Sequence, residues 1–552
     1  MINYKKSFVL LVLSLILSLA FMTSLMPTSA ASAPPREKIV RIVQSWPVRI
    51  DPDVGLDNLA MICLNNFYDT LLTIDDSGAP QPEVAESWEF NADTLTYTFK
   101  INNGIKFHNG DELKASDVVF SLKRKIDIGE GWGYLFRGAI KNVSAPNTET
   151  VMITIERPIG TFLLYLAHVA VLNEKQVIEN TKKEGSYGEF GDYGKDWLLT
   201  HDAGSGPYMI GEVRLAEYVI GVRNPNYWQE IDKDAPDSFK IIGVTEPVTV
   251  RTLMAKKELE ITDEWQPTEN YVSMSKLPGV KVATLITGAP LLLVFNTSKP
   301  PFDDVHFRRA VTYIFDYEVC KDQILPTSER TRGPVSPLLP GGDPSLPLLE
   351  RNLEKAKAEL AQSPYAAKLD QYPIEFWWNA VVPDQEKIAL LLQSNCQEIG
   401  IKVNLVKSSW TLQVDAAAKP DTTPHIFPIN QTSLPYPEAG ALLYSVYHSS
   451  ARGTKNNTHW LDDATQTELD SMIEDAIATL DTSERYQKYR AIIRKILDLA
   501  LEIAVVEIPL RHAYQAEYLM WPTAKAAETG EKINIMPGLR MQFKDMRFIS
   551  GE

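Results

Sequence analysis

An apolar run followed by an amphipathic segment lies just past the middle of the chain, over residues 290–318. Leu291–Phe295 is fully apolar, which is typical of a strand buried on both faces. Pro300-Pro301 has no N–H groups and ends the strand, and the aspartate pair at 303–304 can cap a helix. Apolar residues from 307 to 315 then recur at helical spacing. We expect half of a βαβ unit here, carrying the chain from one α/β lobe into a second.

Alternating and helical patterns predict further elements on both sides of this segment. Strands are expected at 38–44, 95–101, 150–155, 240–244, 374–378, 401–405 and 505–510. Helices are expected at 59–72, 162–171, 248–254, 352–361, 384–399, 466–480 and 484–501. The strand–helix–strand order over 374–405 predicts a right-handed parallel unit.

Three blocks carry the resemblance to a known family. The first, at residues 296–316, reads N-T-x-x-P-P-F-D-D-V-x-x-R-R-A. The second, at residues 85–124, contains the hairpin AESWEFNADTLTYTFKINNGIKFHNG. The third consists of two turns, GSGPY at 204–208 and RNPNYW at 223–228. Together they resemble the peptide/nickel family of extracytoplasmic solute-binding proteins, the ligand-capturing subunits of ABC importers. Lys114 departs from the family, in which a threonine usually caps the following helix.

The resemblance implies an α/β, two-lobed, periplasmic-binding-protein-like fold of the class II or cluster C type, with an accessory subdomain in the first lobe. It implies lobe I at 36–80, 205–288 and 502–552, the accessory subdomain at 81–204, and lobe II at 289–501. It also implies a membrane ABC permease and its ATPase as partners, a monomer, no cofactor and no catalysis.

The N-terminus changes the picture of where the protein acts. Lys5 and Lys6 precede an apolar run from Phe8 to Met26, and small residues follow up to Ala33. This order favours a secretory signal peptide at residues 1–33, and so a periplasmic or other extracytoplasmic location. An uncleaved anchor is the alternative, because the run is nearly long enough to span a bilayer.

Composition excludes some functions and leaves the ligand open. The 552 residues are too many for one hydrophobic core, and a net charge of -16 argues against nucleic acid as a partner. Zinc-protease, nucleophile-elbow and phosphate-loop motifs are missing from the sequence. The cysteines at 63, 320 and 396 are expected to be small buried residues.

Aromatic residues after strands are the best candidates for a binding cleft, because ligands of open α/β sheets sit beyond the carboxyl ends of the strands. Trp46, Trp265, Trp378 and Trp410 each hold such a position. Each could instead fill the core, and of the neighbours Trp377 and Trp378 we expect one to face it.

The segment 429–450 resembles the family's cleft loop, which usually contains D-Y-P-D-P. Pro435 stands where the first aspartate is expected, and that carboxylate pairs with the ligand's amino terminus in peptide-binding members. Tyr436 survives from the motif, and Gln431, Thr432 and Ser433 offer neutral hydrogen-bonding groups. Because these groups are neutral, we expect a solute without a free amino group. The alternative is that another acid pairs with the amino group, and Glu438 is the nearest one in sequence.

The resulting expectation is a binding protein that captures a small solute between two lobes and delivers it to an ABC permease. A peptide or peptide-like ligand is the family default, and oligosaccharides, opines and metal chelates are alternatives. A sensor that docks on a membrane receptor is a function of another class, and a secreted hydrolase is a more distant one.

Overall fold

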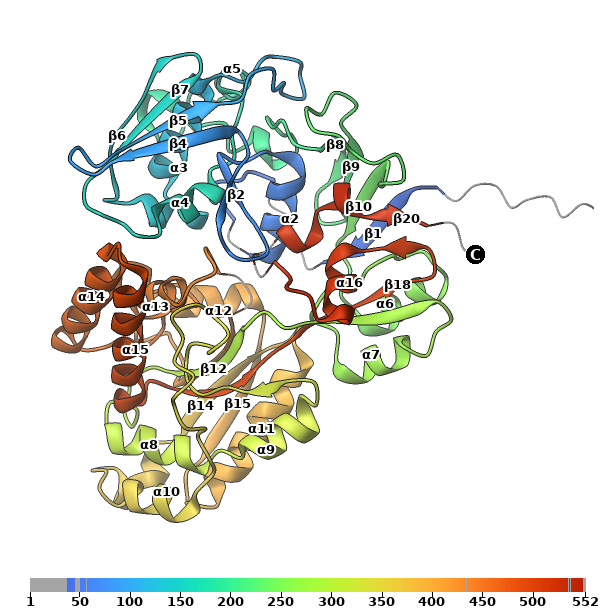
Figure 1. Ribbon diagram of the computed structural model, residues 1–552. Helices are drawn as coiled ribbons and strands as arrows, with labels where there is room; N and C mark the ends of the chain where they lie inside the picture. Colours follow the sequence, from blue (N-terminus) through green and yellow to red (C-terminus); the bar gives the residue numbers. More distant parts are fainter. Residues whose placement is uncertain are drawn as a thin grey trace, which may run out of the picture. The chain divides into compact units, whose positions relative to one another are not determined.

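The computed structural model describes residues 37–44, 50–55, 57–431, 434–534, 536 and 538–549. The predicted signal peptide, Trp46, Thr432 and Ser433 lie outside these described residues. The described chain forms two α/β lobes, joined by two chain segments that run side by side (Figure 1). Among the described helices, none is long and apolar enough to cross a membrane.

Lobe I is built around one twisted sheet. Its strands are β1 (Ile39–Val43), β10 (Ser238–Ile242), β9 (Tyr218–Arg223) and β8 (Tyr208–Arg214), in that order, with only β1 and β10 parallel. A second pair, β11 (Val280–Leu285) and β18 (Leu510–Gln515), is antiparallel. Ile261 bridges to both Ile42 and Tyr514 and so connects the two groups of strands. The remaining elements are α2 (Asn58–Phe67), α6 (Pro247–Ala255), α7 (Thr268–Met274), α16 (Pro522–Thr529), β19 (Leu519–Met520) and β20 (Arg547–Phe548).

The hairpin block at residues 85–110 forms part of a separate antiparallel sheet. Its strands run in the order β4 (Ala85–Asn91), β5 (Thr96–Ile101), β7 (Thr150–Ile155) and β6 (Ile140–Asn147). Helix α3 (Ala115–Ile128) packs on β6 and β7, and the Asp117 carboxylate accepts from the Lys114 N–H at its start. Asp117 thus satisfies the backbone N–H of Lys114, which stands in place of the family's threonine. The neighbouring elements are β2 (Leu72–Ile74), β3 (Pro80–Pro82), α4 (Phe162–Tyr165) and α5 (Glu174–Glu179).

Lobe II has a six-stranded sheet in the order β13 (Glu329–Arg330), β17 (Glu502–Glu507), β12 (Pro290–Phe295), β16 (Ile426–Asn430), β14 (Ile374–Asn379) and β15 (Val403–Ser408). The carboxyl ends of β14, β15, β16 and β17 meet at the edge where β12 begins. That edge faces the two interlobe connections. The helices are α8 (Val305–Ile314), α9 (Tyr317–Val319), α10 (Leu353–Leu360), α11 (Pro383–Gln397), α12 (Trp410–Ala417), α13 (Ala439–Tyr447), α14 (Asp463–Ala478) and α15 (Thr482–Leu499) (Figure 1).

The predicted buried strand at 291–295 is confirmed, because every residue of β12 is buried. The expected parallel βαβ unit at this point is wrong, since β12 runs antiparallel to both of its neighbours, β16 and β17. The strand enters lobe II from the hinge, whereas its neighbours run toward the hinge. The parallel unit predicted over 374–405 is confirmed by the pairing of β14 with β15.

Three elements differ most from the predicted ones. The helix expected at 59–72 ends at Phe67, because Leu72 belongs to β2. The helix expected at 162–171 has only a short α4 and one 3₁₀ turn, and Ala170 instead bridges to Thr70. The return strand expected at 505–510 is two strands, β17 and β18, with the interlobe connection at 508–509 between them.

Candidate functional site

A small cavity of about 40 Å³ lies at the hinge end of the cleft between the lobes. Lobe I contributes Glu264 and Trp265, which follow the bridging residue Ile261, and lobe II contributes Asn430 at the carboxyl end of β16. Ile508 and Pro509 of the second interlobe connection and Arg511 near the start of β18 complete the wall. Strand ends of an open α/β sheet are where such folds bind ligands, so this cavity is the candidate solute site.

Glu264 is held in the cavity wall by neutral groups. Its carboxylate accepts from the Asn58 Nδ2 at 2.7 Å and from the Gln44 Nε2 at 3.4 Å. Gln44 follows the end of β1 and Asn58 begins α2, so two elements of lobe I fix the side chain. The residue is only 7% exposed, and no Lys, Arg or His of the described chain lies within 4.0 Å of its carboxylate.

Arg511 crosses from lobe I toward lobe II at the same cavity. Its guanidinium donates to the Thr268 Oγ1 at 3.1 Å and lies 3.8 Å from the Asp384 carboxylate near the start of α11. Thr268 also donates to Asp384 at 3.1 Å, and Lys387 of α11 pairs with Glu269 of α7 at 2.7 Å. Polar contacts between α7 and α11 therefore join the lobes beside the cavity.

Two polar atoms near the end of β16 have no hydrogen-bond partner within the described residues. They are the Asn430 Oδ1, on a cavity-lining residue, and the Gln431 Nε2. Both atoms are buried, and a buried polar atom without a partner costs about 1–3 kcal/mol. A ligand with complementary groups would recover part of that cost.

The structure separates the tryptophans that the sequence analysis grouped together. Trp265 is half-buried in the cavity wall, and Trp410 is 52% exposed at the start of α12. Trp378 is 4% exposed and packs in the same hydrophobic cluster as residues of α11, so it belongs to the core of lobe II. Its neighbour Trp377 faces the opposite side of β14, near Phe427, because side chains alternate along a strand. Trp378 is therefore not part of the site proposed below.

The loop after β16 is tied to the accessory subdomain and to lobe II. The carbonyl of Pro435 accepts a hydrogen bond from the Nε2 of His168. Tyr436 is fully buried against Tyr165, with 5.3 Å between the ring centroids. Glu438 accepts from the Nε of Arg485 at 2.7 Å, and both side chains are at most 6% exposed. Glu438 is thus held by a charge of its own lobe and is not offered to a ligand.

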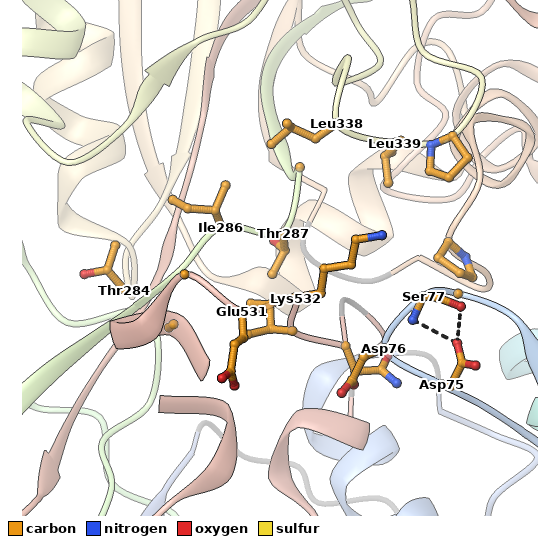
Figure 2. A pocket seen from close by; sticks show the side chains of 18 residues that line it. Asp75, Asp76, Ser77, Thr284, Ile286, Thr287, Leu338, Leu339, Glu531 and Lys532 are labelled. Carbon is orange, nitrogen blue, oxygen red and sulfur yellow. Dashed lines mark hydrogen bonds between the residues drawn. The ribbon is translucent and has the colours of Figure 1, made fainter. Parts of the chain in front are cut away.

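A larger cavity of about 410 Å³ lies on another part of the interlobe boundary. Figure 2 shows Asp75, Asp76 and Ser77 on one side of it and Leu338 and Leu339 on the other, with Glu531 and Lys532 between them. The Asp75 carboxylate accepts from the N–H and hydroxyl of Ser77 and so belongs to its own turn. None of the described lobe II strands has its carboxyl end at this larger cavity, so the smaller cavity is the better candidate despite its smaller volume.

The turn motifs that marked the family have a structural role. Asp69 accepts from Ser205 at 2.8 Å, from Tyr227 at 2.9 Å and from Trp228 at 3.0 Å. The first donor belongs to GSGPY and the other two to RNPNYW. Burial raises the pKa of Asp69, and burial with the nearby Asp69 charge raises the pKa of Glu83 to about 7. The motifs therefore satisfy a buried carboxylate within lobe I.

The cysteines and other titratable residues form no reactive cluster in the described part of the chain. Cys63, Cys320 and Cys396 are buried and free, as expected, and burial raises the pKa of each thiol. The described residues contain no group of three or more His, Cys, Asp or Glu side chains placed to hold a metal ion.

Sequence reasoning missed Glu264, Asn430 and Arg511. Glu264 follows the bridging residue Ile261 and Asn430 ends β16, the same signal that selected the tryptophans, whereas Arg511 lies at the amino end of β18. The search for stacking residues passed over them, and Arg511 could not be placed because the return segment was expected as one strand.

Comparison with known proteins agrees with this architecture. The sequence profile of a family described as "Bacterial extracellular solute-binding proteins, family 5 Middle" matches residues 79–454. The probable D,D-dipeptide-binding periplasmic protein DdpA of Escherichia coli K12 is 26% identical over 486 residues, which cover 85% of this chain and 88% of DdpA. Heme-binding protein A of Haemophilus influenzae is 24% identical over 444 residues, covering 74% of this chain and 76% of that protein. Both relatives are named as binding proteins.

Solved structures share the fold over almost the whole chain. The periplasmic binding protein DppA of Helicobacter pylori, in complex with the peptide STSA, has a TM-score of 0.79 at 19% identity and covers 93% of this chain and 98% of its own. AgaA of A. tumefaciens, in complex with agropinic acid, has a TM-score of 0.76 at 19% identity, covering 93% and 99%.

Proposed function

The chain belongs to the family 5 bacterial extracellular solute-binding proteins of ABC importers, and we propose that it captures its solute in the cavity at the hinge end of the cleft. The observation that carries this proposal is the origin of the cavity wall. Glu264, Trp265 and Arg511 come from lobe I, Asp384 and Asn430 from lobe II, and Ile508 and Pro509 from the second interlobe connection. A ligand that contacts all of them favours one arrangement of the lobes.

The small volume of the cavity supports a binding mechanism in which the lobes move. A space of about 40 Å³ is smaller than the 300–1,000 Å³ typical of small-molecule sites, so the lobes must part to admit a solute. In the part of the chain that the structure describes, two connections, at 286–289 and 508–509, join the lobes, which favours motion about a hinge. The closed, ligand-loaded form is then the one that a membrane permease would recognise.

We also propose where the protein acts, its oligomeric state and its partners. The mature protein acts outside the cytoplasm after removal of a signal peptide, works as a monomer, and delivers its solute without chemical change to a permease powered by an ATPase. The names of DdpA and of other relatives as periplasmic proteins support the location. We also propose lobe I at 36–80, 205–288 and 508–552, an accessory subdomain at 81–204, and lobe II at 289–507. The expected boundary between 501 and 502 is moved because β17 pairs with β12 and β13 in the lobe II sheet.

A peptide or peptide-like solute is the first ligand class to test. It is supported by DdpA, named for D,D-dipeptides, and by the Helicobacter pylori structure with a bound peptide. An opine, a metal chelate or an oligosaccharide is the alternative. The structure of AgaA with agropinic acid supports testing the opine class.

Native mass spectrometry of the purified protein tests capture, because a tight binder often retains its ligand. The ligand so identified, or a hit from a solute panel, would then be added in small-angle X-ray scattering. We expect the radius of gyration to fall on saturation, and no fall would contradict closure about the hinge.

A further inference from the structure

The cavity presents an acidic wall to its ligand. Its charged lining residues are Glu264, Asp384 and Arg511, so acidic groups outnumber basic ones. Asp384 already accepts from Thr268 at 3.1 Å and from Lys387 at 3.0 Å and lies 3.8 Å from Arg511. Glu264, in contrast, receives hydrogen bonds from the amides of Gln44 and Asn58 alone among the described groups.

A carboxylate held only by neutral donors has no ion-pair partner of its own and can accept a hydrogen bond from a ligand. Arg540 and His512, the basic groups that interact electrostatically with Glu264 in the described structure, form no ion pair with it within 4.0 Å and lie outside the cavity lining. Burying an anion without a cation at ion-pair distance is costly, and part of the cost is recovered when a positive group binds directly. Glu264 therefore fits a charged hydrogen-bond donor.

Asn430 and Trp265, which line the same cavity as Glu264, also favour a positively charged hydrogen-bond donor. The buried Oδ1 of Asn430, on the lobe II side, is an acceptor without a donor in the described structure. Trp265 lines the cavity next to Glu264, and an indole face attracts a cation. An ammonium group has three N–H donors and a positive charge, which match a carboxylate, a carbonyl oxygen and an aromatic ring.

We propose that Glu264 binds a protonated amino group of the solute, with Asn430 and Trp265 completing the subsite. This inference rests on the proposed function and names its ligand class, a solute with a free amine such as an unblocked peptide. It departs from the expectation drawn from Pro435 and Glu438. The carboxylate missing at Pro435 is replaced from lobe I, by a residue 171 positions earlier in the chain.

The test is a calorimetric titration of a panel of matched solutes. The panel holds amino acids, di- and tripeptides and polyamines, each beside its N-acetylated form, together with neutral oligosaccharides. We expect binders among the free amines, and an affinity loss of at least about 10-fold on acetylation, since a hydrogen bond to a charged group contributes about 1.5–3 kcal/mol.

Variants of the chain separate the subsite from the rest of the protein. Glu264→Gln should weaken the best amine ligand by at least about 10-fold, and Glu264→Asp, which keeps the charge, should retain more of the affinity. Glu531→Gln removes the same charge from the larger cavity and should leave binding unchanged. Far-UV circular dichroism and a melting curve for each variant report whether it is folded.

The outcomes distinguish the inference from the function beneath it. Equal binding of free and acetylated solutes, or unchanged affinity in folded Glu264→Gln, overturns the amine subsite and leaves the solute-binding function in place. A loss in Glu531→Gln with none in Glu264→Gln moves the ligand to the larger cavity. Failure of every solute class to bind, with no retained ligand in native mass spectrometry, contradicts the proposed function itself.

Discussion

His168 of the accessory subdomain donates a hydrogen bond to the carbonyl oxygen of Pro435, in the loop that follows β16 of lobe II. His168 is buried and packs against Trp132, with 5.2 Å between the ring centroids. Pro435, which stands where the family has an aspartate, therefore fixes the loop through its backbone carbonyl. Burial lowers the pKa of His168 to about 4, so the imidazole is neutral at pH 7 and donates from Nε2.

Replacement of His168 should change how stability depends on pH. The folded state resists protonation of His168, whereas the unfolded chain takes up a proton near the ordinary pKa of 6.5. Wild type therefore loses stability as the pH falls from about 6.5 to about 4. His168→Gln should lower the free energy of unfolding by about 1 kcal/mol at pH 7 and flatten this decline. Urea titrations at pH 7 and pH 5 measure both effects. His201→Gln, at an exposed site, should have neither, and an equally steep decline in His168→Gln would contradict the assignment.

Glu83 should have the opposite pH dependence. Burial, reinforced by the Asp69 charge, raises its pKa to about 7, above the ordinary 4.5. Its contribution to stability is complete below about 4.5 and is lost as the pH rises through 7. Glu83→Gln, which cannot ionise, should gain roughly 2 kcal/mol relative to wild type between pH 5 and pH 8. Melting temperatures across this range test the prediction, and a constant difference between the two proteins would refute it.

The buried ion pair of Glu438 and Arg485 should matter for stability and not for ligand binding. Loss of one partner leaves a buried charge uncompensated, so Glu438→Ala should lower the free energy of unfolding by about 3 kcal/mol. Arg494→Ala, on the same helix α15, breaks a pair whose arginine is 59% exposed and should cost less than about 1 kcal/mol. Denaturant titration compares the two variants. A clear loss of ligand affinity in folded Glu438→Gln would show that Glu438 serves the ligand after all.

Trp265 and Trp410 should differ in their effect on affinity. Trp265 lines the cavity, so Trp265→Ala should weaken binding of the best ligand by about 1 kcal/mol or more, or at least about fivefold. Trp410 lies outside the cavity lining on an exposed helix start, and Trp410→Ala should have a smaller effect. Calorimetry on both variants with one ligand decides the order, and a larger loss for Trp410→Ala would move the site toward α12.

The sequence was sufficient for the elements whose pattern is strong and local. β12 is apolar throughout and lies buried between two strands, and the amphipathic helices α8, α11, α14 and α15 lie where their periodicity predicts them. Strand direction is a property of pairing and not of composition. An apolar strand has the same pattern in either orientation, so the antiparallel placement of β12 could not be read from it.

The site was harder to predict than the fold because its residues come from distant segments. Glu264, Asn430 and Arg511 meet only through the packing of two lobes, and no local spacing connects them. Trp378 failed as a candidate for a related reason. Alternation along β14 requires Trp377 and Trp378 to face opposite sides, but only the surrounding helices decide which side is core.

The register of β11 with β18 has a consequence for how the molecule could be divided. Leu285 and Leu510 are direct partners across this antiparallel ladder. Leu285 ends β11 before the chain enters lobe II, and Leu510 begins β18 after the chain has returned. The whole second lobe is thus an insertion into what would otherwise be a hairpin, and a two-residue turn could close it. Pro290 and Glu507 are partners in the same way within lobe II. Either module could be excised at paired strand ends, which makes the two halves of the binding site separable pieces for recombination between family members.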